Sequence, residues 1–147
     1  MTGNEPGYTP PDLTLLGEEH IRRYRETDGE VGHIWREDST ILLLTTAGRR
    51  TGRETTTPLI YTLDGDTPVI VASQGGAPDH PGWYKNLLVH PEVEVQVGTK
   101  TVKAKARTVS GPERAKLWEG ALKFWPPYAD YAKKTPREIP VVVLDPV

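Results

Sequence analysis

The segment Thr45-Thr46-Ala47-Gly48-Arg49-Arg50-Thr51-Gly52-Arg53 joins two apolar stretches and places three arginines and two glycines in a short link. Glycine allows a backbone with positive φ and lets N–H groups come close to a ligand, while an arginine fork matches pairs of phosphate or carboxylate oxygens. The link is therefore expected to bind an anion. Its composition is equally compatible with an exposed basic hairpin, so both interpretations stay open at this stage.

The residues on either side of the link predict strands. Residues 39–47 contain Ile41-Leu42-Leu43-Leu44, a run typical of a strand buried on both faces. Residues 54–63 predict a second strand, closed by a turn at Asp64-Gly65-Asp66, and residues 69–73 predict a third.

The next part of the chain predicts one helix and one hairpin. Residues 74–80 are too rich in glycine and proline for regular structure, and a helix is expected from Pro81 to about Val89. Alternating residues at 93–97 and 102–106 predict a half-exposed hairpin around Gly98-Thr99. That register sets Glu94 opposite Lys103 on the solvent face and Val95 opposite Val102 on the core face.

Both ends of the chain predict further elements. Ser110-Gly111-Pro112-Glu113 is a capping-box pattern that should start a helix, which Trp125-Pro126-Pro127 should end. Residues 128–134 predict a loop or short helix, residues 140–144 a last strand, and residues 13–25 a short early helix. We expect a flexible arm at residues 1–11 and one mainly β (α+β) domain at 12–147, a barrel of about six mostly antiparallel strands with short flanking helices.

Composition limits the classes of function. The chain has 147 residues, 36% hydrophobic and 26% charged, with a formal net charge of −2. This balance argues against a protein built to bind nucleic acid. The chain has no cysteine, so redox chemistry must come from a cofactor. No apolar run approaches the ~20 residues of a membrane helix, and no secretory signal is evident. A cytoplasmic protein is expected, with peripheral membrane association left open.

The four histidines, His20, His33, His80 and His90, show no metal-ligand spacing, so no metal site is predicted. His80 stands out because it ends the irregular segment at residues 74–80 and lies beside the proposed site.

Several segments carry a resemblance to a known family, in that family's order and at its spacing. They are Leu44-Thr45-Thr46-Ala47-Gly48-Arg49-Arg50-Thr51-Gly52, Pro58-Leu59, Ile70-Val71-Ala72-Ser73-Gln74-Gly75-Gly76, Pro81-Gly82-Trp83-Tyr84-Lys85-Asn86-Leu87, Pro91, Tyr128-Ala129-Asp130-Tyr131 and Ile139-Pro140-Val141-Val142-Val143. On these segments the chain resembles the deazaflavin-dependent nitroreductase family. The resemblance implies a split β-barrel and the 5-deazaflavin coenzyme F420, an 8-hydroxy-5-deazaflavin with a phosphate and a glutamate tail, rather than FMN.

The resemblance also implies the site. The residues that would contact the cofactor are Arg49, Arg50, Thr51, Thr55, Thr56, Thr57, Pro58, Leu59, Ile60, Val71, Ala72, Ser73, Gln74, Gly82, Trp83, Tyr84, Lys85, Asn86 and Tyr128. Trp83 could stack on the ring or anchor its helix, and the anchor is favoured. Ser73, Tyr128 and Tyr131 would act on the substrate, with lid packing as the alternative for the tyrosines.

The function expected from this resemblance is hydride transfer from reduced F420 to a small electron-poor acceptor, a quinone, an enone or a nitroaromatic. Ile60, Gln74 and Trp125 depart from members that reduce bulky nitroheterocycles, so the acceptor stays open. A carrier of F420, flavin or heme without turnover is one alternative, and a nucleic-acid module using Arg49, Arg50 and Arg53 is another. A homodimer is compatible with the sequence but is not required by it.

Overall fold

The computed structural model describes residues 17–31, 33–34, 40–73 and 76–147. The arm expected at residues 1–11 and the predicted site residue Gln74 lie outside them. The elements are α1 (Gly17–Glu26), β1 (Ile41–Ala47), β2 (Glu54–Asp64), β3 (Thr67–Val71), α2 (Gly82–Val89), β4 (Glu92–Val97), β5 (Lys100–Thr108), α3 (Gly111–Phe124), α4 (Pro127–Lys134) and β6 (Val141–Pro146).

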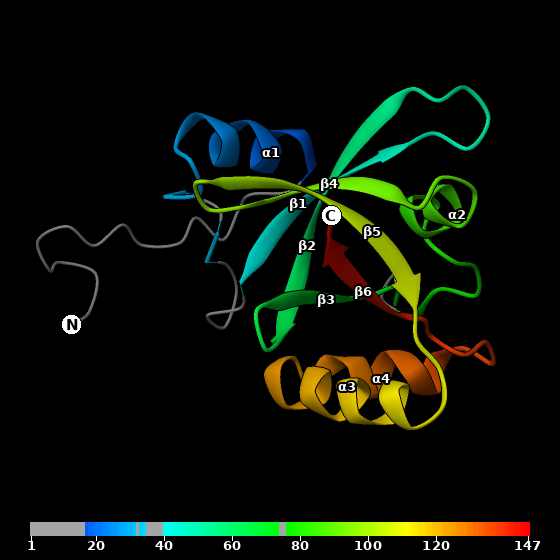
Figure 1. The fold of residues 1–147 in the computed structure, drawn as a ribbon. Coiled ribbons are helices and arrows are strands. Elements are labelled where there is room, and N and C mark those ends of the chain that lie inside the picture. Colours follow the sequence, from blue (N-terminus) through cyan, green and yellow to red (C-terminus); the bar gives the residue numbers. More distant parts are fainter. Residues whose placement is uncertain (1–16, 32, 35–39, 74–75) are drawn as a thin grey trace, which may run out of the picture.

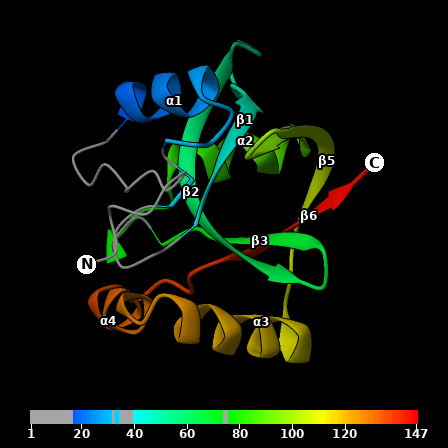
Figure 2. The same ribbon diagram turned by 90° about the vertical axis from the view of Figure 1, so that its left-hand side faces the viewer.

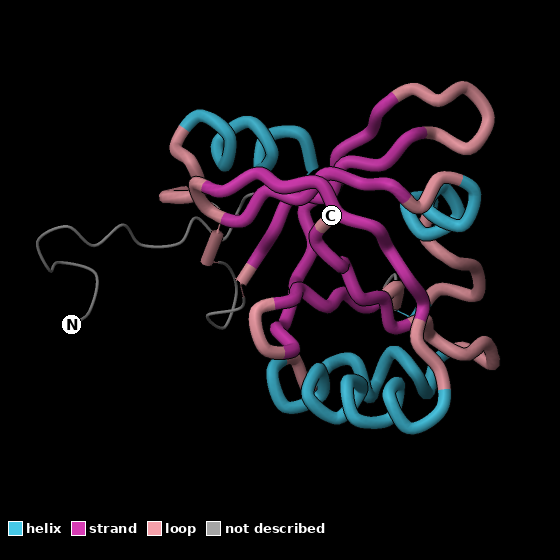
Figure 3. Tube along the Cα trace, viewed as in Figure 1, coloured by secondary structure: helices cyan, strands magenta, loops and turns pink. Residues whose placement is uncertain are grey.

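Six strands form a closed barrel in the order β1-β2-β3-β6-β5-β4, and every neighbouring pair is antiparallel. This confirms the mostly antiparallel barrel predicted from the strand pattern. The helices lie outside the strands, as the tube in Figure 3 shows. In Figures 1 and 2, α1 lies on one side of the barrel and the neighbouring pair α3 and α4 lies on the opposite side. No described helix is long and apolar enough to cross a membrane.

Strand β1 is buried on both faces, as its apolar run predicts, because its two faces pack against different partners. Leu42 and Leu44 belong to the cluster that fills the barrel, whereas Ile41 and Leu43 pack with Tyr24 of α1. All four β1 side chains are at most 2% exposed. Burying an aliphatic side chain of this size is worth about 1.5–3 kcal/mol, so both layers contribute to stability.

Helix α2 closes the barrel core. Its Trp83, Tyr84 and Leu87 belong to the same buried cluster as the inward side chains of the strands. On the opposite side, α3 and α4 cover the outer face of β3 and β6, where Leu117 packs with Val69 and Val143. Both α2 and α4, which carry predicted site residues, therefore pack on the same barrel.

The hairpin of β4 and β5 has the predicted register, with Glu94 opposite Lys103 and Val95 opposite Val102 across the Gly98-Thr99 turn. The expectation that Val102 faces the core is wrong. Val95 is 1% exposed, but Val102 is 42% exposed. Val95 also pairs with Leu44 of β1, whereas β6 pairs with β5 only from Ala104 to Thr108, so Val102 lies beyond the part of β5 that has a second neighbouring strand.

The start of α3 differs from the predicted capping box. Ser110 occupies the N-cap position, but its side chain makes no capping hydrogen bond. Glu113 instead accepts two hydrogen bonds from Arg107 Nη1, both at 3.1 Å, and Arg107 Nε also donates to Asp145. An arginine on the adjacent strand therefore competes successfully for the glutamate that the capping box requires.

Two boundaries also shift. β3 ends at Val71 rather than at residue 73, and residues 127–134 form the helix α4. The early helix is described from Gly17, so the first part of its expected range lies outside the described residues.

Candidate functional site

The arginine link is a closed turn between β1 and β2. The Gly48 N–H donates to the Arg53 carbonyl at 2.8 Å, and the Gly52 N–H donates to the Gly48 carbonyl at 2.8 Å. Gly52 has φ = +72°, a conformation that costs glycine little. The Thr51 hydroxyl accepts from the Arg53 N–H at 3.2 Å. Thr51 therefore helps to shape the turn.

Asn86 of α2 anchors this turn to the barrel. Its Oδ1 accepts from the Arg49 N–H at 3.2 Å and from Arg49 Nη1 at 3.0 Å. Its Nδ2 donates to Thr46 Oγ1 at 3.2 Å, and Thr46 Oγ1 lies 3.3 Å from Thr55 Oγ1. Asn86 and Thr46 are buried, with exposed fractions of 7% and 1%. One amide of α2 thus binds both the link and β1, and Thr46 extends this network to β2.

The other two arginines of the link present their charge to solvent. Arg50 and Arg53 are exposed, and neither guanidinium has a hydrogen bond or ion pair to any described residue. The Arg49 guanidinium donates one hydrogen bond to Asn86, and its other N–H groups remain available to a ligand. A turn with unpaired guanidiniums, held in place by a buried amide, fits a ligand that carries phosphate and carboxylate groups.

The six predicted groove residues of β2 divide between two faces of the sheet. Thr55 lies beside Thr46, on the side of Asn86, whereas Thr56 hydrogen-bonds Thr45 at 2.8 Å and accepts from Arg25 of α1 at 3.0 Å. Side chains continue to alternate between the two faces along β2. Leu59 packs in the barrel core and Ile60 packs on the side of α1. A ligand on one face therefore contacts every second side chain of this set.

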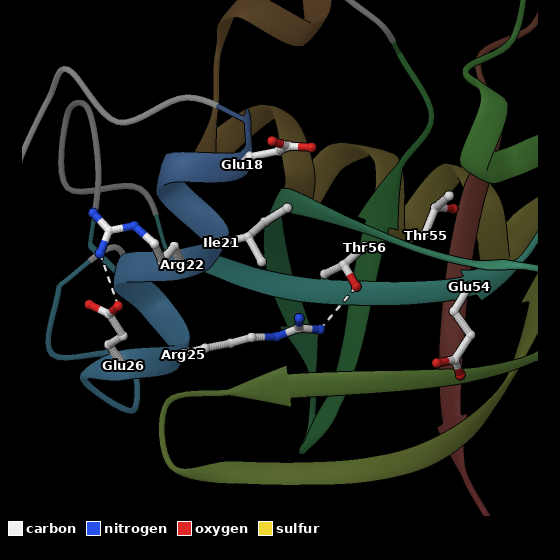
Figure 4. A pocket seen from close by; sticks show the side chains of 8 residues that line it. All are labelled: Glu18, Ile21, Arg22, Arg25, Glu26, Glu54, Thr55 and Thr56. Carbon is white, nitrogen blue, oxygen red and sulfur yellow. Dashed lines mark hydrogen bonds and ion pairs between the residues drawn. The ribbon is translucent and has the colours of Figure 1, made fainter.

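A pocket of about 570 Å³ lies between α1 and β2 and is drawn in Figure 4. Arg22 and Arg25 line it, but Arg22 pairs with Glu26 at 2.9 Å and Arg25 is bonded to Thr56. The pocket also exposes Glu18 and Glu54, so its carboxylates outnumber its guanidiniums. An anionic ligand is better matched by the link than by this pocket.

Ser73 lies just beyond β3 and is buried, at 7% exposure. Its carbonyl accepts from Arg137 Nη2 at 2.7 Å and from the Gly76 N–H at 3.0 Å. Arg137 also bonds Ala72, Ala77 and His80, and no sequence pattern singled it out. It lies in a charged segment, between Lys133-Lys134 and Glu138, and only the fold brings it to Ser73.

Tyr128 packs against the same part of β3. It is 5% exposed and shares a buried cluster with Val71, two residues before Ser73. Its ring lies 6.1 Å from that of Tyr131, and burial raises the pKa of its hydroxyl well above the usual range. Its hydroxyl makes no hydrogen bond to a described residue. The structure therefore brings Ser73 and the tyrosines to one end of β3.

The backbone of Gly76 packs closely against α4. A Cβ placed on Gly76 would lie 2.6 Å from the Tyr131 carbonyl oxygen, and Gly76 has φ = +84°. Glycine is therefore required here by both space and conformation. Gly76 is therefore packed against the helix that carries both tyrosines.

The predicted residues of α2 have distinct surroundings. Trp83 is 8% exposed in the barrel core, which supports its interpretation as an anchor. The Tyr84 hydroxyl lies 2.9 Å from Thr108 Oγ1, and Lys85 pairs with Asp79 at 2.5 Å, which lowers the pKa of that carboxyl. Gly82 is exposed, with no described atom within 4 Å of a Cβ position. Within the described ranges, no group of histidines and carboxylates has metal-site geometry.

Comparison with known proteins identifies the family. The model of a family described as F420H(2)-dependent quinone reductase matches residues 16–146. An F420H(2)-dependent quinone reductase of Mycobacterium tuberculosis is 42% identical over 132 residues, which cover 85% of this chain and 86% of that protein.

Two solved structures are also similar. A structure described as an F420-H2 dependent reductase has a TM-score of 0.67 and 40% identity, over 71% of this chain and 93% of its own. A structure described as a domain-swapped dimer has a TM-score of 0.69 and 37% identity, over 85% of this chain and 96% of its own.

Proposed function

The chain belongs to the F420H(2)-dependent quinone reductase family, and on this premise we propose that it transfers a hydride from reduced coenzyme F420 to a quinone-type acceptor. The observation that carries the proposal is the anchored arginine link: Asn86 holds the turn, while Arg50 and Arg53 keep unpaired guanidiniums. The coenzyme carries its negative charge on a phosphate and a glutamate tail, which guanidiniums bind well.

In this proposal, the tail lies along Arg49, Arg50 and Thr51. Bound reduced F420 supplies a hydride and a proton, so that a quinone becomes a quinol and no further reductant is needed. The protein contributes alignment and exclusion of water. Among the described residues at the end of β3, the hydroxyl-bearing side chains are Ser73 and Tyr128, which are buried, and Tyr131, which is half-buried. This set agrees with a division in which the coenzyme supplies the reducing equivalents.

Ser73 and Tyr128 are proposed to face the reacting groups. A tyrosine hydroxyl is protonated at neutral pH, and burial raises the pKa of Tyr128 further, so this hydroxyl can donate a hydrogen bond to the quinone oxygen. Tyr131, half-buried against Tyr128, is the second candidate. We expect Tyr128→Phe to lower kcat about tenfold or more with F420 affinity changed less than threefold, measured by steady-state kinetics and fluorescence titration. A change confined to affinity would assign Tyr128 to binding.

The activity is tested with purified protein, reduced F420 and menadione. Oxidation of the coenzyme is followed by the return of its absorbance, with protein omitted in the control. Turnover that depends on protein is expected. Saturable F420 binding without turnover on any quinone, enone or nitro compound would favour the carrier alternative, and preferential binding of FMN would contradict the cofactor assignment.

Three finer points also belong to this proposal. Menadione and other quinones are expected to be better acceptors than enones and nitroaromatics, as the names of the relatives suggest. Dimerisation is suggested by the similar structure described as a domain-swapped dimer, and light scattering on the purified chain tests it. The cytoplasmic location stays a prediction from the sequence.

A further inference from the structure

Arg137 binds four acceptors in two segments of the chain. Its Nη1 donates to the Ala72 carbonyl at 3.1 Å and to His80 Nδ1 at 3.0 Å. Its Nη2 donates to the Ser73 carbonyl at 2.7 Å, and its Nε donates to the Ala77 carbonyl at 3.0 Å. Four of the five guanidinium N–H groups are thus engaged on the segments that follow β3 and precede α2.

This arrangement requires a planar fork. Three acceptors are backbone carbonyls that point to one place from residues 72, 73 and 77, and a guanidinium can reach them together because its donors diverge in one plane. A lysine ammonium keeps the charge but is a single point, so it cannot reproduce this set. The shape of Arg137, and not only its charge, therefore holds the two segments together.

The same contact selects the tautomer of His80. Arg137 is a donor only, so His80 Nδ1 must accept, and the neutral ring carries its hydrogen on Nε2. The ring also packs edge-on against Tyr84, with the centroids 5.0 Å apart. Burial and the neighbouring Arg137 both lower the pKa of His80, in agreement with a neutral ring.

The clamped segments adjoin the end of β3, the contact of Gly76 with α4, and the start of α2. Ala72 continues the barrel through a hydrogen bond from its N–H to the Pro140 carbonyl at 2.9 Å. Residue 77 directly follows Gly76, which packs against the backbone of Tyr131. His80 lies two residues before the first residue of α2, the helix that contains Asn86. A shift of one segment against the other would move Ser73 relative to both α2 and α4.

We propose that Arg137 is a positioning residue for hydride transfer, which fixes Ser73 and the start of α2 relative to each other by clamping residues 72–73 and 77–80. This rests on the proposed function, since it presumes that the end of β3 faces the reacting groups. Arg137 itself acts through the backbone and through His80.

The kinetic test compares Arg137→Gln and Arg137→Lys with Arg114→Gln. Arg114 is a matched control because its Nη2 also donates to a backbone carbonyl, that of Ile139, at 2.7 Å, and its guanidinium also packs on a neighbouring ring, Trp118. All variants should lose stability. Only the Arg137 variants should lose about 10- to 100-fold in the single-turnover rate of menadione reduction by pre-bound reduced F420, with Kd for F420 changed less than threefold.

A second readout needs neither coenzyme nor turnover. In ¹⁵N-labelled protein without ligand, the His80 ring should show the Nε2–H tautomer in the wild type and in Arg114→Gln. It should show mixed tautomers in Arg137→Lys. The lysine variant keeps the charge, so it serves if Arg137→Gln does not fold.

The outcomes distinguish the proposed function from the positioning role of Arg137. A wild type that binds F420 but reduces no quinone overturns the proposed function, and the positioning role with it. A wild type that turns over, with Arg137 variants as fast as Arg114→Gln, overturns the positioning role alone. Rescue of the rate by Arg137→Lys, or an unchanged His80 tautomer in that variant, would also overturn it.

Discussion

Replacing Asn86 with alanine should loosen the arginine link and destabilise the barrel together. The substitution removes three hydrogen bonds, two from Arg49 and one to the buried Thr46 hydroxyl. At about 1 kcal/mol each, the free energy of unfolding should fall by about 3 kcal/mol. For a chain of this length, that corresponds to a melting temperature lower by about 10 °C.

The affinity for F420 should fall as well. Without the Asn86 hydrogen bonds, the arginine link is mobile in the free protein, and binding must then supply the free energy that orders it. Ordering a few side chains costs about 1 kcal/mol or more, so Kd for F420 should rise about fivefold or more. Fluorescence titration well below the melting temperature of Asn86→Ala measures this.

Tyr24→Phe is the matched control for this experiment. The Tyr24 hydroxyl lies 3.0 Å from the Ile41 carbonyl and 3.3 Å from the Gln96 carbonyl, and it accepts from the Gly98 N–H at 2.7 Å. Its loss should cost comparable stability with F420 affinity unchanged. If both variants weaken binding equally, or if Asn86→Ala binds F420 as the wild type does, the anchoring argument is refuted.

Two further predictions concern stability. Gly76→Ala should lower the free energy of unfolding by about 3 kcal/mol or more, because the new Cβ would clash with the Tyr131 carbonyl oxygen at a position with positive φ. Gly65→Ala, at φ = +64° with open space around the Cβ, should lower it by about 1 kcal/mol. Equal losses for the two variants in urea denaturation would contradict this. Burial raises the pKa of Tyr24 to about 12 from 10.0, so the unfolded chain loses this proton first and stability should fall as pH rises from about 10 to about 12. The fall should be shallower in Tyr24→Phe, and curves of equal slope would show that Tyr24 does not contribute.

Most of the fold could be predicted from local patterns. The apolar run of β1, the turn at Gly65 and the register of the β4–β5 hairpin each follow from residues close together in the sequence. The exposure of Val102 and the diversion of Glu113 to Arg107 could not be predicted in this way. Both depend on which distant element covers a face or offers a stronger partner.

The sequence and the family resemblance propose the residues of the candidate site, but they do not predict which of these residues contact one another. The glycines and arginines of the link predict an anion site, and the family resemblance implies that Asn86 contacts the cofactor. That Asn86 holds the link depends on how α2 packs against β1, which local patterns do not predict. Strand alternation sends Thr55 and Thr56 to opposite faces, but which face each takes depends on the pairing of β2 with β1. Arg137 lies 64 residues from Ser73 in sequence and carries no local signal of its contacts.

The most direct test of the account measures the binding of two ligands to Arg50→Ala. Oxidised F420 carries the phosphate and glutamate tail, whereas 8-hydroxy-5-deazariboflavin has the same ring system without it. If Arg50 binds the tail, Arg50→Ala should weaken F420 binding about 10-fold or more and leave the binding of the tailless compound unchanged. Lys123→Ala, which makes the same change of charge on the exposed face of α3, should affect neither. Equal weakening of both ligands, or of neither, would contradict the claim that the arginine link binds the anionic end of the coenzyme.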